Sequence, residues 1–379
     1  MTSYNGLLFF YVMALLLVPA VVLGLRNRSL KGYGFIFTVV MAFLIFDTWG
    51  KRAVLIAFYM WETALVLLYR RIREKNQARP LLWLFVLLAA APLIITKLGG
   101  IIPSFNFIHL LGVSYMTFRA VQVLIETYDG LITEIKLLDF SYFLLFFPSI
   151  SSGPIDRYRR FGDDLQKAPG RGTYLELLKV GIWKLMWGAL FNFVISSLIY
   201  SKWLLPLPES GFLPTISYMY GYTFFLFFNF AGYSLMAIGT SYILGIKTPD
   251  NFNMPFLSRD MKDFWSRWHI SLSTWMRDYV YTRFVSAALK GEWYKERRTA
   301  SYVGYVITMT TMGLWHGLTL RYIVYGVYHG ILMCVNDILD TRWKRFRKLK
   351  REDLPSILLI FITFHLFSFG LLIFSGRFF

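Results

Sequence analysis

Two histidines stand in segments whose residue types could support acid–base chemistry. The first lies in DFWSRWHISLSTWMRDYVY (263–281), together with three tryptophans, several hydroxyls and two Arg/Asp pairs. The second lies in GLWHG (313–317). Because the ordinary pKa of histidine is about 6.5, a neutral imidazole can accept a proton at neutral pH. Both segments are therefore candidate sites of catalysis.

The first histidine, His269, lies in a segment with helical periodicity. If one helix covers 261–279, Asp263 and Arg267 pair across one turn, and Ser266, His269 and Ser273 share a polar side. The apolar residues then form one broad stripe: Met261, Phe264, Trp265, Trp268, Leu272, Trp275, Met276 and Tyr279. The distributed charges favour a helix in the membrane interface. The alternative is a purely architectural helix in which His269 has no chemical role.

The second histidine, His316, follows an apolar segment at 301–315. Fifteen helical residues rise about 22 Å, whereas the hydrocarbon core is about 30 Å thick. If the basic loop at 290–298 is cytoplasmic, His316 lies inside the membrane, where an ionisable group is a functional candidate. Gly313 and Gly317 are expected to leave space beside its imidazole. A histidine that only hydrogen-bonds between helices is the alternative.

The other three histidines, His109, His329 and His365, stand singly in apolar segments and are expected to be packing residues. The sequence has no His-Glu-x-x-His run, cysteine pair, P-loop or Gly-x-Ser-x-Gly elbow. These absences argue against a metalloenzyme, an NTP-driven pump and an ordinary serine hydrolase. No metal site is expected.

The composition is typical of a polytopic membrane protein. Of the 379 residues, 56% are hydrophobic and 19% aromatic, and several apolar runs reach the about 18 residues that a spanning helix needs. The expected helices are 5–25, 33–48, 53–69, 80–97, 107–127, 137–150, 174–200, 213–245, 301–315, 322–339 and 355–374. This predicts an all-α membrane protein with some 9 to 12 spans, in one integral membrane domain covering 1–379.

Two of these segments are expected to be broken. Pro148 and Pro154 interrupt the sixth segment, and Gly221, Gly232 and Gly239 punctuate the eighth. Irregular backbone at membrane depth is tolerated where protein or water covers it. The chain is therefore expected to include re-entrant pieces.

The charge is strongly positive, at +18 from 40 basic and 22 acidic residues. Basic loops after the first and third expected spans place those loops in the cytoplasm and the N-terminus outside. The excess also favours contact with anionic lipids or with an acidic protein partner, rather than nucleic-acid binding. The single cysteine, Cys334, cannot form an intramolecular disulfide.

Several segments resemble conserved blocks of the membrane-bound O-acyltransferase family. They are GVSYMTFRAVQ (112–122), FFPSISSGPIDRYRRF (146–161), FNFAGYSLMAIGTSYILGIKTPDNFNMPF (228–256), DFWSRWHISLSTWMRDYVY and LWHG. The two histidine blocks, in this order and 47 residues apart, are specific to the family. Within the family, the segments FNFAGYS and GIKTPDNFN resemble the branch that acts in D-alanylation of teichoic acids in Gram-positive bacteria. They resemble the alginate O-acetylating branch less.

For the fold, the resemblance implies a ring of about 11 transmembrane helices around a thin, funnelled centre, with short interfacial and re-entrant helices. Residues 1–100 would form the N-terminal helices, 101–339 the family core, and 340–379 a basic loop and the last helix. The expected location is the bacterial plasma membrane.

For the activity, the resemblance implies transfer of an acyl group from a cytoplasmic thioester to a hydroxyl. His316 corresponds to the family's catalytic histidine and His269 to its second position. In the D-alanylating branch, the donor is D-alanine on the phosphopantetheine arm of a small acidic carrier protein. The acceptor is lipoteichoic or wall teichoic acid, and a membrane-anchored transfer partner of the DltD type assists. No cofactor is expected in the chain itself, because the phosphopantetheine arrives on the carrier.

The region 263–298 is expected to form a cytoplasmic mouth, with His269 directed inward toward His316. Its basic residues would steer the acidic carrier, and a small apolar patch would dock it. The basic residues are Arg283, Lys290, Lys295, Arg297 and Arg298, and the patch is Val285, Ala287, Ala288 and Leu289. Ordinary positive-inside topology is the alternative explanation of the charges.

Three other functions fit parts of this pattern. A transporter could use His316 as a proton relay, although the sequence shows no inverted repeat. A non-catalytic scaffold could assemble a D-alanylation complex. Within the enzyme class, the alternative is O-acetylation of an exported polysaccharide.

Overall fold

A computed structural model gives the architecture of the chain. It describes residue 4 and residues 6–102, 111–350 and 352–378, apart from the side chains at 345, 347 and 353–355. Within these ranges the regular structure is helical, and the one β pairing is an isolated bridge between Phe252 and Trp268. The all-α prediction is confirmed.

The chain forms two compact units. The first comprises Met1–Leu190 and Gly232–Pro249, and the second comprises Phe191–Ala231 and Asp250–Phe379. The chain passes between the units inside helix α9 (Phe212–Ile243). The single membrane domain expected for 1–379 stays a prediction.

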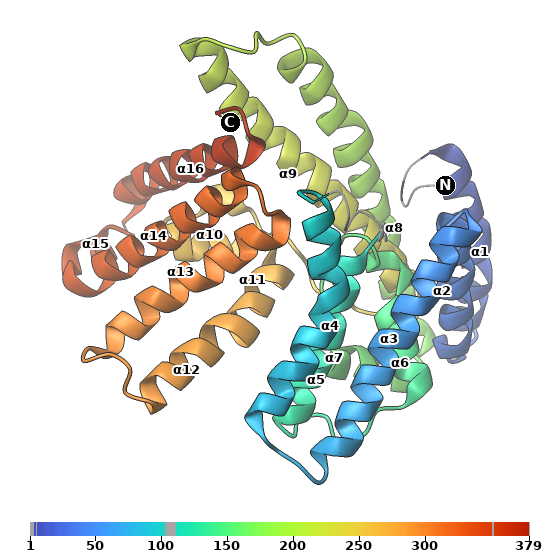
Figure 1. Ribbon diagram of the computed structural model, residues 1–379. Coiled ribbons are helices and arrows are strands. Elements are labelled where there is room, and N and C mark those ends of the chain that lie inside the picture. Colours follow the sequence, from blue (N-terminus) through green and yellow to red (C-terminus); the bar gives the residue numbers. More distant parts are fainter. Residues whose placement is uncertain (1–3, 5, 103–110, 351, 379) are drawn as a thin grey trace. The chain divides into compact units, whose positions relative to one another are not determined.

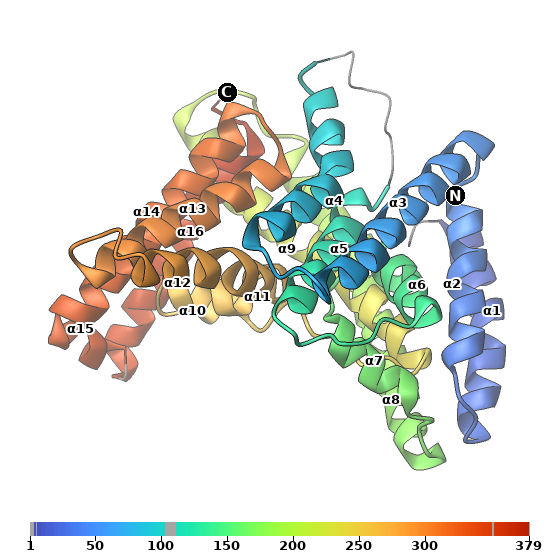
Figure 2. The same ribbon diagram turned by 60° about the horizontal axis from the view of Figure 1, so that its bottom comes forward.

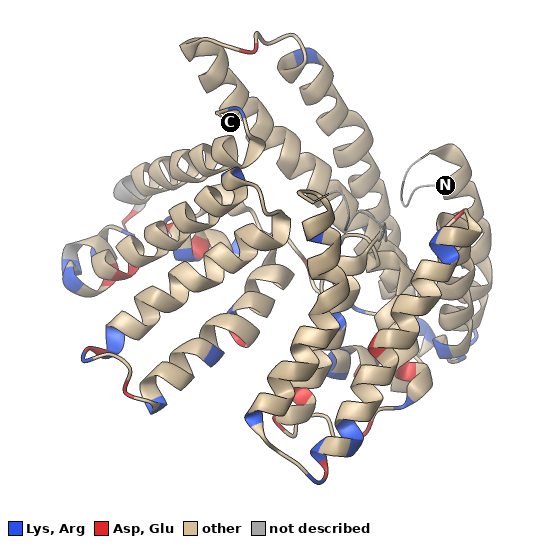
Figure 3. Cartoon of the chain, viewed as in Figure 1, with Lys and Arg blue, Asp and Glu red and all other residues tan. Residues whose placement is uncertain are grey.

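Seven helices of the described chain are long and apolar enough to cross a membrane. They are α1 (Leu7–Leu25), α3 (Trp49–Arg73), α4 (Arg79–Gly99), α8 (Arg171–Ala189) with its π-helical continuation to Leu204, α9, α14 (Leu320–Arg342) and α16 (Asp353–Ser375) (Figure 1). The protein is therefore a multi-pass membrane protein. Charged side chains lie mostly near helix ends and in connections (Figure 3), as expected of membrane helices.

Four other expected spans are not among these seven. They correspond to α2 (Lys31–Ile45), α5 (Val113–Tyr128), α6 (Leu137–Leu145) and α13 (Arg297–His316). Helix α2 is a shorter apolar helix, and α6 has nine residues. The expected helix 107–127 begins outside the described residues.

Of the two expected interruptions, one is confirmed and one is wrong. Helix α6 ends at Leu145, and Pro148 lies in the short 3-10 turn that follows. Helix α9, by contrast, is continuous over 32 residues. Its glycines permit close packing: a Cβ on Gly239 would lie 2.5 Å from the carbonyl oxygen of Gly181 in α8. Small residues at such contacts let membrane helices approach closely, without breaking either helix.

A buried arginine organises the polar core of the first unit. The side chain of Arg119, in α5, is 1% exposed. Its guanidinium donates to the carbonyl oxygens of Phe143 (3.1 Å), Leu144 (2.9 Å) and Ser149 (2.7 Å), and to Ser149 Oγ (2.7 Å). These carbonyls lie where α6 ends and the chain turns, where the helix alone does not supply every carbonyl with a donor. Arg119 thus joins the segments 112–122 and 146–161.

The second unit is built around the antiparallel pair α13 and α14. Helix α16 packs against α14, and α12 (Thr282–Lys290) packs against α13 (Figures 1 and 2). Helix α10 (Met261–Arg267) contacts both α14 and α16 and is followed by α11 (Ile270–Met276). This unit contains both candidate histidines, His269 between α10 and α11 and His316 at the end of α13.

Candidate active site

The segment expected as one helix over 261–279 is broken at its centre, so that prediction is wrong. Trp268 is extended, and His269 has φ +44°, in the left-handed region. The break arises because this backbone pairs with residues far upstream. The N–H of Asn253 donates to the carbonyl of Arg267 (3.0 Å), and the N–H of Ile270 donates to the carbonyl of Asn251 (3.0 Å). Local periodicity carries no information about these partners.

The side-chain pattern survives the break. Asp263 and Arg267 form the predicted ion pair at 2.6 Å. The predicted apolar stripe is confirmed, since all of its members are buried: Met261, Phe264, Trp265, Trp268, Leu272, Trp275, Met276 and Tyr279. His269, however, does not share an exposed polar side with Ser266, because it is 4% exposed.

His269 lies in an apolar, aromatic environment outside the seven candidate spans. The ring of Phe230 meets it edge-on at 4.6 Å, and the ring of Trp315 lies 6.3 Å away. Burial, with a smaller contribution from the nearby His316, lowers the pKa of His269 to about 3. The ring is therefore neutral at neutral pH. Its Nε2 is buried and has no hydrogen-bond partner among the described protein atoms.

His316 is the last residue of α13 and is half-buried. Its imidazole contacts the rings of Trp315 (4.5 Å), Phe374 (4.9 Å) and Tyr322 (6.1 Å). Trp315 also contacts His269. The fold thus brings two histidines that are 47 residues apart in sequence to the same tryptophan.

The two glycines beside His316 do not leave an empty space, which corrects that expectation. A Cβ on Gly313 would lie 2.2 Å from the carbonyl oxygen of Tyr322, and one on Gly317 would lie 2.6 Å from the Tyr322 ring. Tyr322 occupies the space, and α14 approaches α13 closely. Arg321 then holds the phenol, donating to the Tyr322 hydroxyl at 3.2 Å. The glycines therefore fix the tyrosine next to His316.

Replacing Gly313 with alanine should destabilise this site. The new methyl group would overlap a backbone carbonyl of α14, and overpacking of this kind costs about 1–3 kcal/mol. We expect a lower thermal unfolding temperature in detergent and reduced acyl transfer. Gly162→Ala is the control, because nothing lies within 4 Å of a Cβ at Gly162. A Gly313→Ala protein as stable as Gly162→Ala would show that the close helix contact is not required.

A cavity of about 400 Å³ lies in the second unit beside these helices. Lys262, Trp265 and Ser273 line it from α10 and α11, and Met309 and Met312 line it from α13. Met312 is one helical turn before His316. Met276 of α11 and Thr308 of α13 also line the cavity, so both helices contribute hydroxyl and thioether side chains. Its size is in the range of pockets that hold small-molecule ligands.

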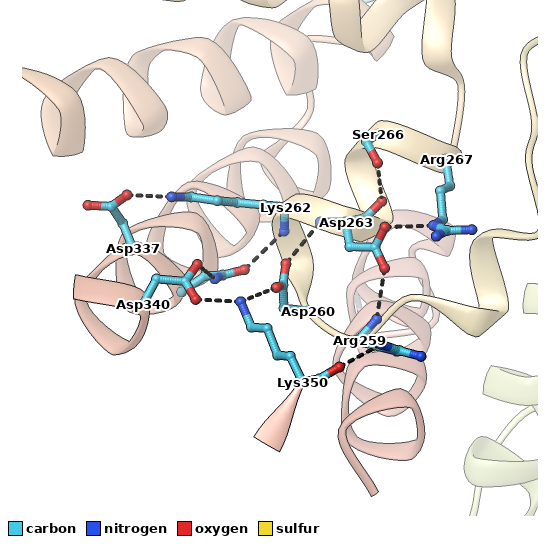
Figure 4. Close-up of polar contacts among 10 residues, drawn as sticks. Arg259, Asp260, Lys262, Asp263, Ser266, Arg267, Asp337, Asp340 and Lys350 are labelled. Atoms are coloured by element: carbon cyan, nitrogen blue, oxygen red, sulfur yellow. Dashed lines mark hydrogen bonds and ion pairs between the residues drawn. The ribbon is translucent and has the colours of Figure 1, made fainter. Parts of the chain in front are cut away.

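Ion pairs fix α10, one wall of this cavity, to α14 (Figure 4). The ammonium of Lys262 pairs with Asp337, and the backbone N–H of Lys262 donates to Asn336 Oδ1 at 3.0 Å. Lys350 bridges Asp260 at the start of α10 and Asp340 of α14. Because these side chains are mostly buried, the network is less screened than a surface ion pair. It sets the position of α10 and of the residues that α10 presents to the cavity.

The predicted carrier-binding residues Arg283, Val285 and Lys290 lie on α12, and Arg298 lies in the first turn of α13. Lys290 and Arg298 are exposed, and the connection between the two helices carries both basic and acidic residues (Figure 3). Arg283 is half-buried. Val285 is also half-buried and packs on α13, since a Cβ on Gly304 would lie 2.9 Å from its Cγ2.

The apolar patch expected beside these residues is corrected in part. Ala288 is 2% exposed and faces inward. Of the predicted patch, Leu289 is exposed (42%), and Trp293 (58%), which was not predicted, is exposed near it in the chain. Both line a hollow of about 450 Å³ together with Lys295 and Arg297. Sequence reasoning missed Trp293, although an exposed tryptophan in a basic loop is a binding signal.

The remaining histidines within the described residues are packed among other side chains. His329 is fully buried, with its ring against Trp265 (5.2 Å) and Tyr325 (4.6 Å). His365 lies with Nδ1 2.6 Å from the carbonyl oxygen of Phe361, within its own helix. His109 lies outside the described residues.

Comparisons with known proteins identify relatives along the whole chain. Residues 51–376 match the membrane-bound O-acyltransferase family. The chain is 42% identical to the teichoic acid D-alanyltransferase of Bacillus subtilis, over 100% of this chain and 98% of that protein. It is 40% identical to the teichoic acid D-alanyltransferase of Streptococcus thermophilus, over 89% and 86% respectively. A probable alginate O-acetylase of Pseudomonas syringae is 31% identical, over 66% of this chain and 47% of that protein.

Proposed function

The chain belongs to the membrane-bound O-acyltransferase family, and we propose that it transfers D-alanine from a carrier-protein thioester to a hydroxyl of teichoic acid. The observation that carries this proposal is the extent of similarity. The D-alanyltransferase of Bacillus subtilis aligns over essentially its entire length, whereas the alginate O-acetylase aligns over about half of its own. The D-alanyl donor is therefore favoured over an acetyl donor.

His316 acts as the general base in this proposal. Its neutral imidazole takes the proton of the acceptor hydroxyl as that oxygen attacks the thioester carbon. The new C–O bond forms, the C–S bond breaks, and the imidazolium returns the proton to the departing thiolate. The thioester contains the driving force for transfer, so the step needs no nucleotide. The aromatic rings around His316 limit water, which would otherwise hydrolyse the thioester.

His269 has a different role, because burial keeps it neutral. With its proton on Nε2, the ring can donate a hydrogen bond to the thioester carbonyl. That bond strengthens as negative charge develops on the oxygen. The absence of a protein partner for Nε2 among the described residues supports this assignment. His269 thus orients and polarises the donor, and His316 activates the acceptor.

The cavity lined by α10, α11 and α13 is the proposed site of the phosphopantetheine arm. The arm alternates amide groups with short methylene runs. Polar groups such as Lys262 and Ser273 suit the amides, and Met309 and Met312 suit the methylenes. Because His316 ends the same helix that bears Met312, an arm in this cavity leads toward the histidine pair.

The exposed basic connection between α12 and α13 is the proposed docking site for an acidic carrier. Lys290 and Arg298 provide the charge, and Leu289 and Trp293 the apolar contact. Arg283 and Val285 are half-buried, and Val285 packs on Gly304 of α13, so their proposed role is to support this surface.

Charge reversal should weaken carrier binding. For Lys290→Glu with Arg298→Glu, we expect the Kd for the D-alanyl carrier to rise about tenfold at low salt, mainly through slower association. The difference should shrink as salt increases, because exposed charges are screened. Binding measured on the protein in nanodiscs tests this. Lys75→Glu, an exposed reversal in the first unit, is the control. Unchanged affinity in the double variant would remove these residues from the interface.

Other parts of the proposal follow from the family. A membrane-anchored transfer partner of the DltD type and a teichoic acid acceptor complete the reaction. A ring of about 11 spans around a thin, funnelled centre is the proposed arrangement in the membrane. O-acetylation of an exported polysaccharide, transport and scaffolding are the alternatives.

Complementation tests the function in cells. A Gram-positive strain that lacks its own D-alanyltransferase, but keeps the carrier and transfer partner, should regain D-alanine ester on teichoic acid when it expresses this chain. If the protein reaches the membrane and no ester returns, the proposed substrate is wrong.

A further inference from the structure

The backbone at His269 is strained, and the strain needs a cause. A histidine with φ +44° and ψ +51° occupies the left-handed region, which residues other than glycine rarely adopt. Such conformations cost about 1–3 kcal/mol and persist only where the surroundings impose them. The side chain of His269 makes no capping hydrogen bond to α11. Some other residue must therefore hold this turn.

Asn251 is positioned to do so. Its backbone carbonyl accepts from the N–H of Ile270 at 3.0 Å. Its side-chain Oδ1 accepts from the N–H of Ser271 at 3.2 Å and from Ser271 Oγ at 2.6 Å. Asn251 thus satisfies the first N–H groups of α11, which a helix cannot satisfy by itself. In effect it is an N-cap supplied from 18 residues upstream of His269.

The hydrogen bonds of Asn251 are buried, and they join two segments of the chain that are far apart in sequence. Asn251 is 1% exposed and Ser271 is 4% exposed, so water does not compete for these hydrogen bonds. The bridge between Phe252 and Trp268 continues the pairing on the other side of His269. The Phe252 ring also meets the Phe230 ring at 5.2 Å, and Phe230 is the residue that contacts the imidazole. The turn is thus fixed on both sides of His269.

We propose that Asn251 is a positioning residue, whose side-chain carbonyl holds His269 in the left-handed turn that directs its imidazole to the donor thioester. The role belongs to Oδ1, because Nδ2 has no partner among the described residues. The proposal rests on the proposed function of His269. It distinguishes Asn251 from a catalytic residue, since Asn251 acts only through the histidine.

Kinetics of the full-length protein in liposomes, with the D-alanyl carrier, transfer partner and teichoic acid, test this role. Asn251→Ala should lower kcat by about 10²-fold, the effect of misplacing a reacting group by about 1 Å. KM for the carrier should stay within about twofold, since the docking surface is untouched. Asn251→Asp keeps an acceptor for Ser271 and should retain more activity than Asn251→Ala. Asn253→Ala is the matched control, because Asn253 is exposed and lies two residues after Asn251.

A double-mutant cycle separates positioning from general structural damage. If Asn251 acts through His269, adding Asn251→Ala to His269→Ala should cause no further loss of the residual transfer. Equal losses in both backgrounds would overturn the proposal, as would wild-type kcat in Asn251→Ala. Should Asn251→Ala fail to accumulate, Ser271→Ala provides the same cycle with one hydrogen bond removed. Absence of transfer by the wild-type protein would instead contradict the proposed function itself.

Discussion

Replacing His316 with alanine should abolish D-alanine transfer while leaving the protein folded. A general base contributes about 10²–10⁴-fold to the rate of such a step. The imidazole is half-buried at the end of α13, so its removal leaves only a small space. The expected loss is therefore in kcat, and the affinity for the carrier should be unchanged.

Quantified D-alanine ester on teichoic acid, normalised to membrane level of the variant, is the measurement. His365→Ala is the control, because this histidine lies in the same unit and contacts only its own helix and neighbouring rings. We expect His365→Ala to retain nearly full ester. Ester at the wild-type level in His316→Ala cells would remove His316 as the base.

Replacing Arg119 with leucine should cause the largest loss of stability among the substitutions considered. The guanidinium makes four hydrogen bonds to buried oxygens: two carbonyls at the end of α6, and the carbonyl and hydroxyl of Ser149 in the 3-10 turn that follows. Leucine would remove these four hydrogen bonds in a region that water does not reach. We expect the free energy of unfolding to fall by about 3–5 kcal/mol. The midpoint of thermal unfolding in detergent measures the change.

A second arginine in the same unit provides the comparison. Arg159 pairs with Glu126 at 3.1 Å, but its side chain is 54% exposed. Because the partner carboxylate of Glu126 is only 6% exposed, Arg159→Leu should cost more than the loss of a fully exposed ion pair, which is about 0–1 kcal/mol, but less than Arg119→Leu, which removes four buried hydrogen bonds. Arg119→Lys should lie between the two, because an ammonium cannot reach all four acceptors. Equal unfolding midpoints for Arg119→Leu and Arg159→Leu would show that the buried network is not required.

The sequence predicted the features of the fold that depend on local pattern. Apolar runs gave the spans at α1, α3, α4, α9, α14 and α16. The helical stripe from Met261 to Tyr279 predicted which side chains are buried. The spacing of Asp263 and Arg267 predicted their ion pair. Each of these follows from residues within a few positions of one another.

Features that depend on distant partners were not predictable in this way. The break at His269 exists because residues 251–253 pair with the chain on both sides of it. The space beside Gly313 is filled because Tyr322 lies on the next helix. A signal was present for Arg119, since an arginine within an apolar segment needs buried acceptors. The sequence did not identify those acceptors, because a helix end and a turn provide them.

The candidate site shows the same division. The two histidine motifs named His269 and His316, and the structure places both near Trp315. Asn251 carries no sequence signature of its role. Its function as a cap is visible only when α11 and the upstream segment are seen together.

The most direct test of the central claim is transfer of isotopically labelled D-alanine by the purified chain. Liposomes would contain the protein, its transfer partner and teichoic acid. One of two labelled donors, the D-alanyl carrier or an acetyl thioester, would be added to the solution outside the liposomes. We predict label on teichoic acid as an alkali-labile ester from the D-alanyl carrier alone, and none with His316→Ala. Equal or greater transfer from the acetyl donor, or transfer that persists in His316→Ala, would contradict this account.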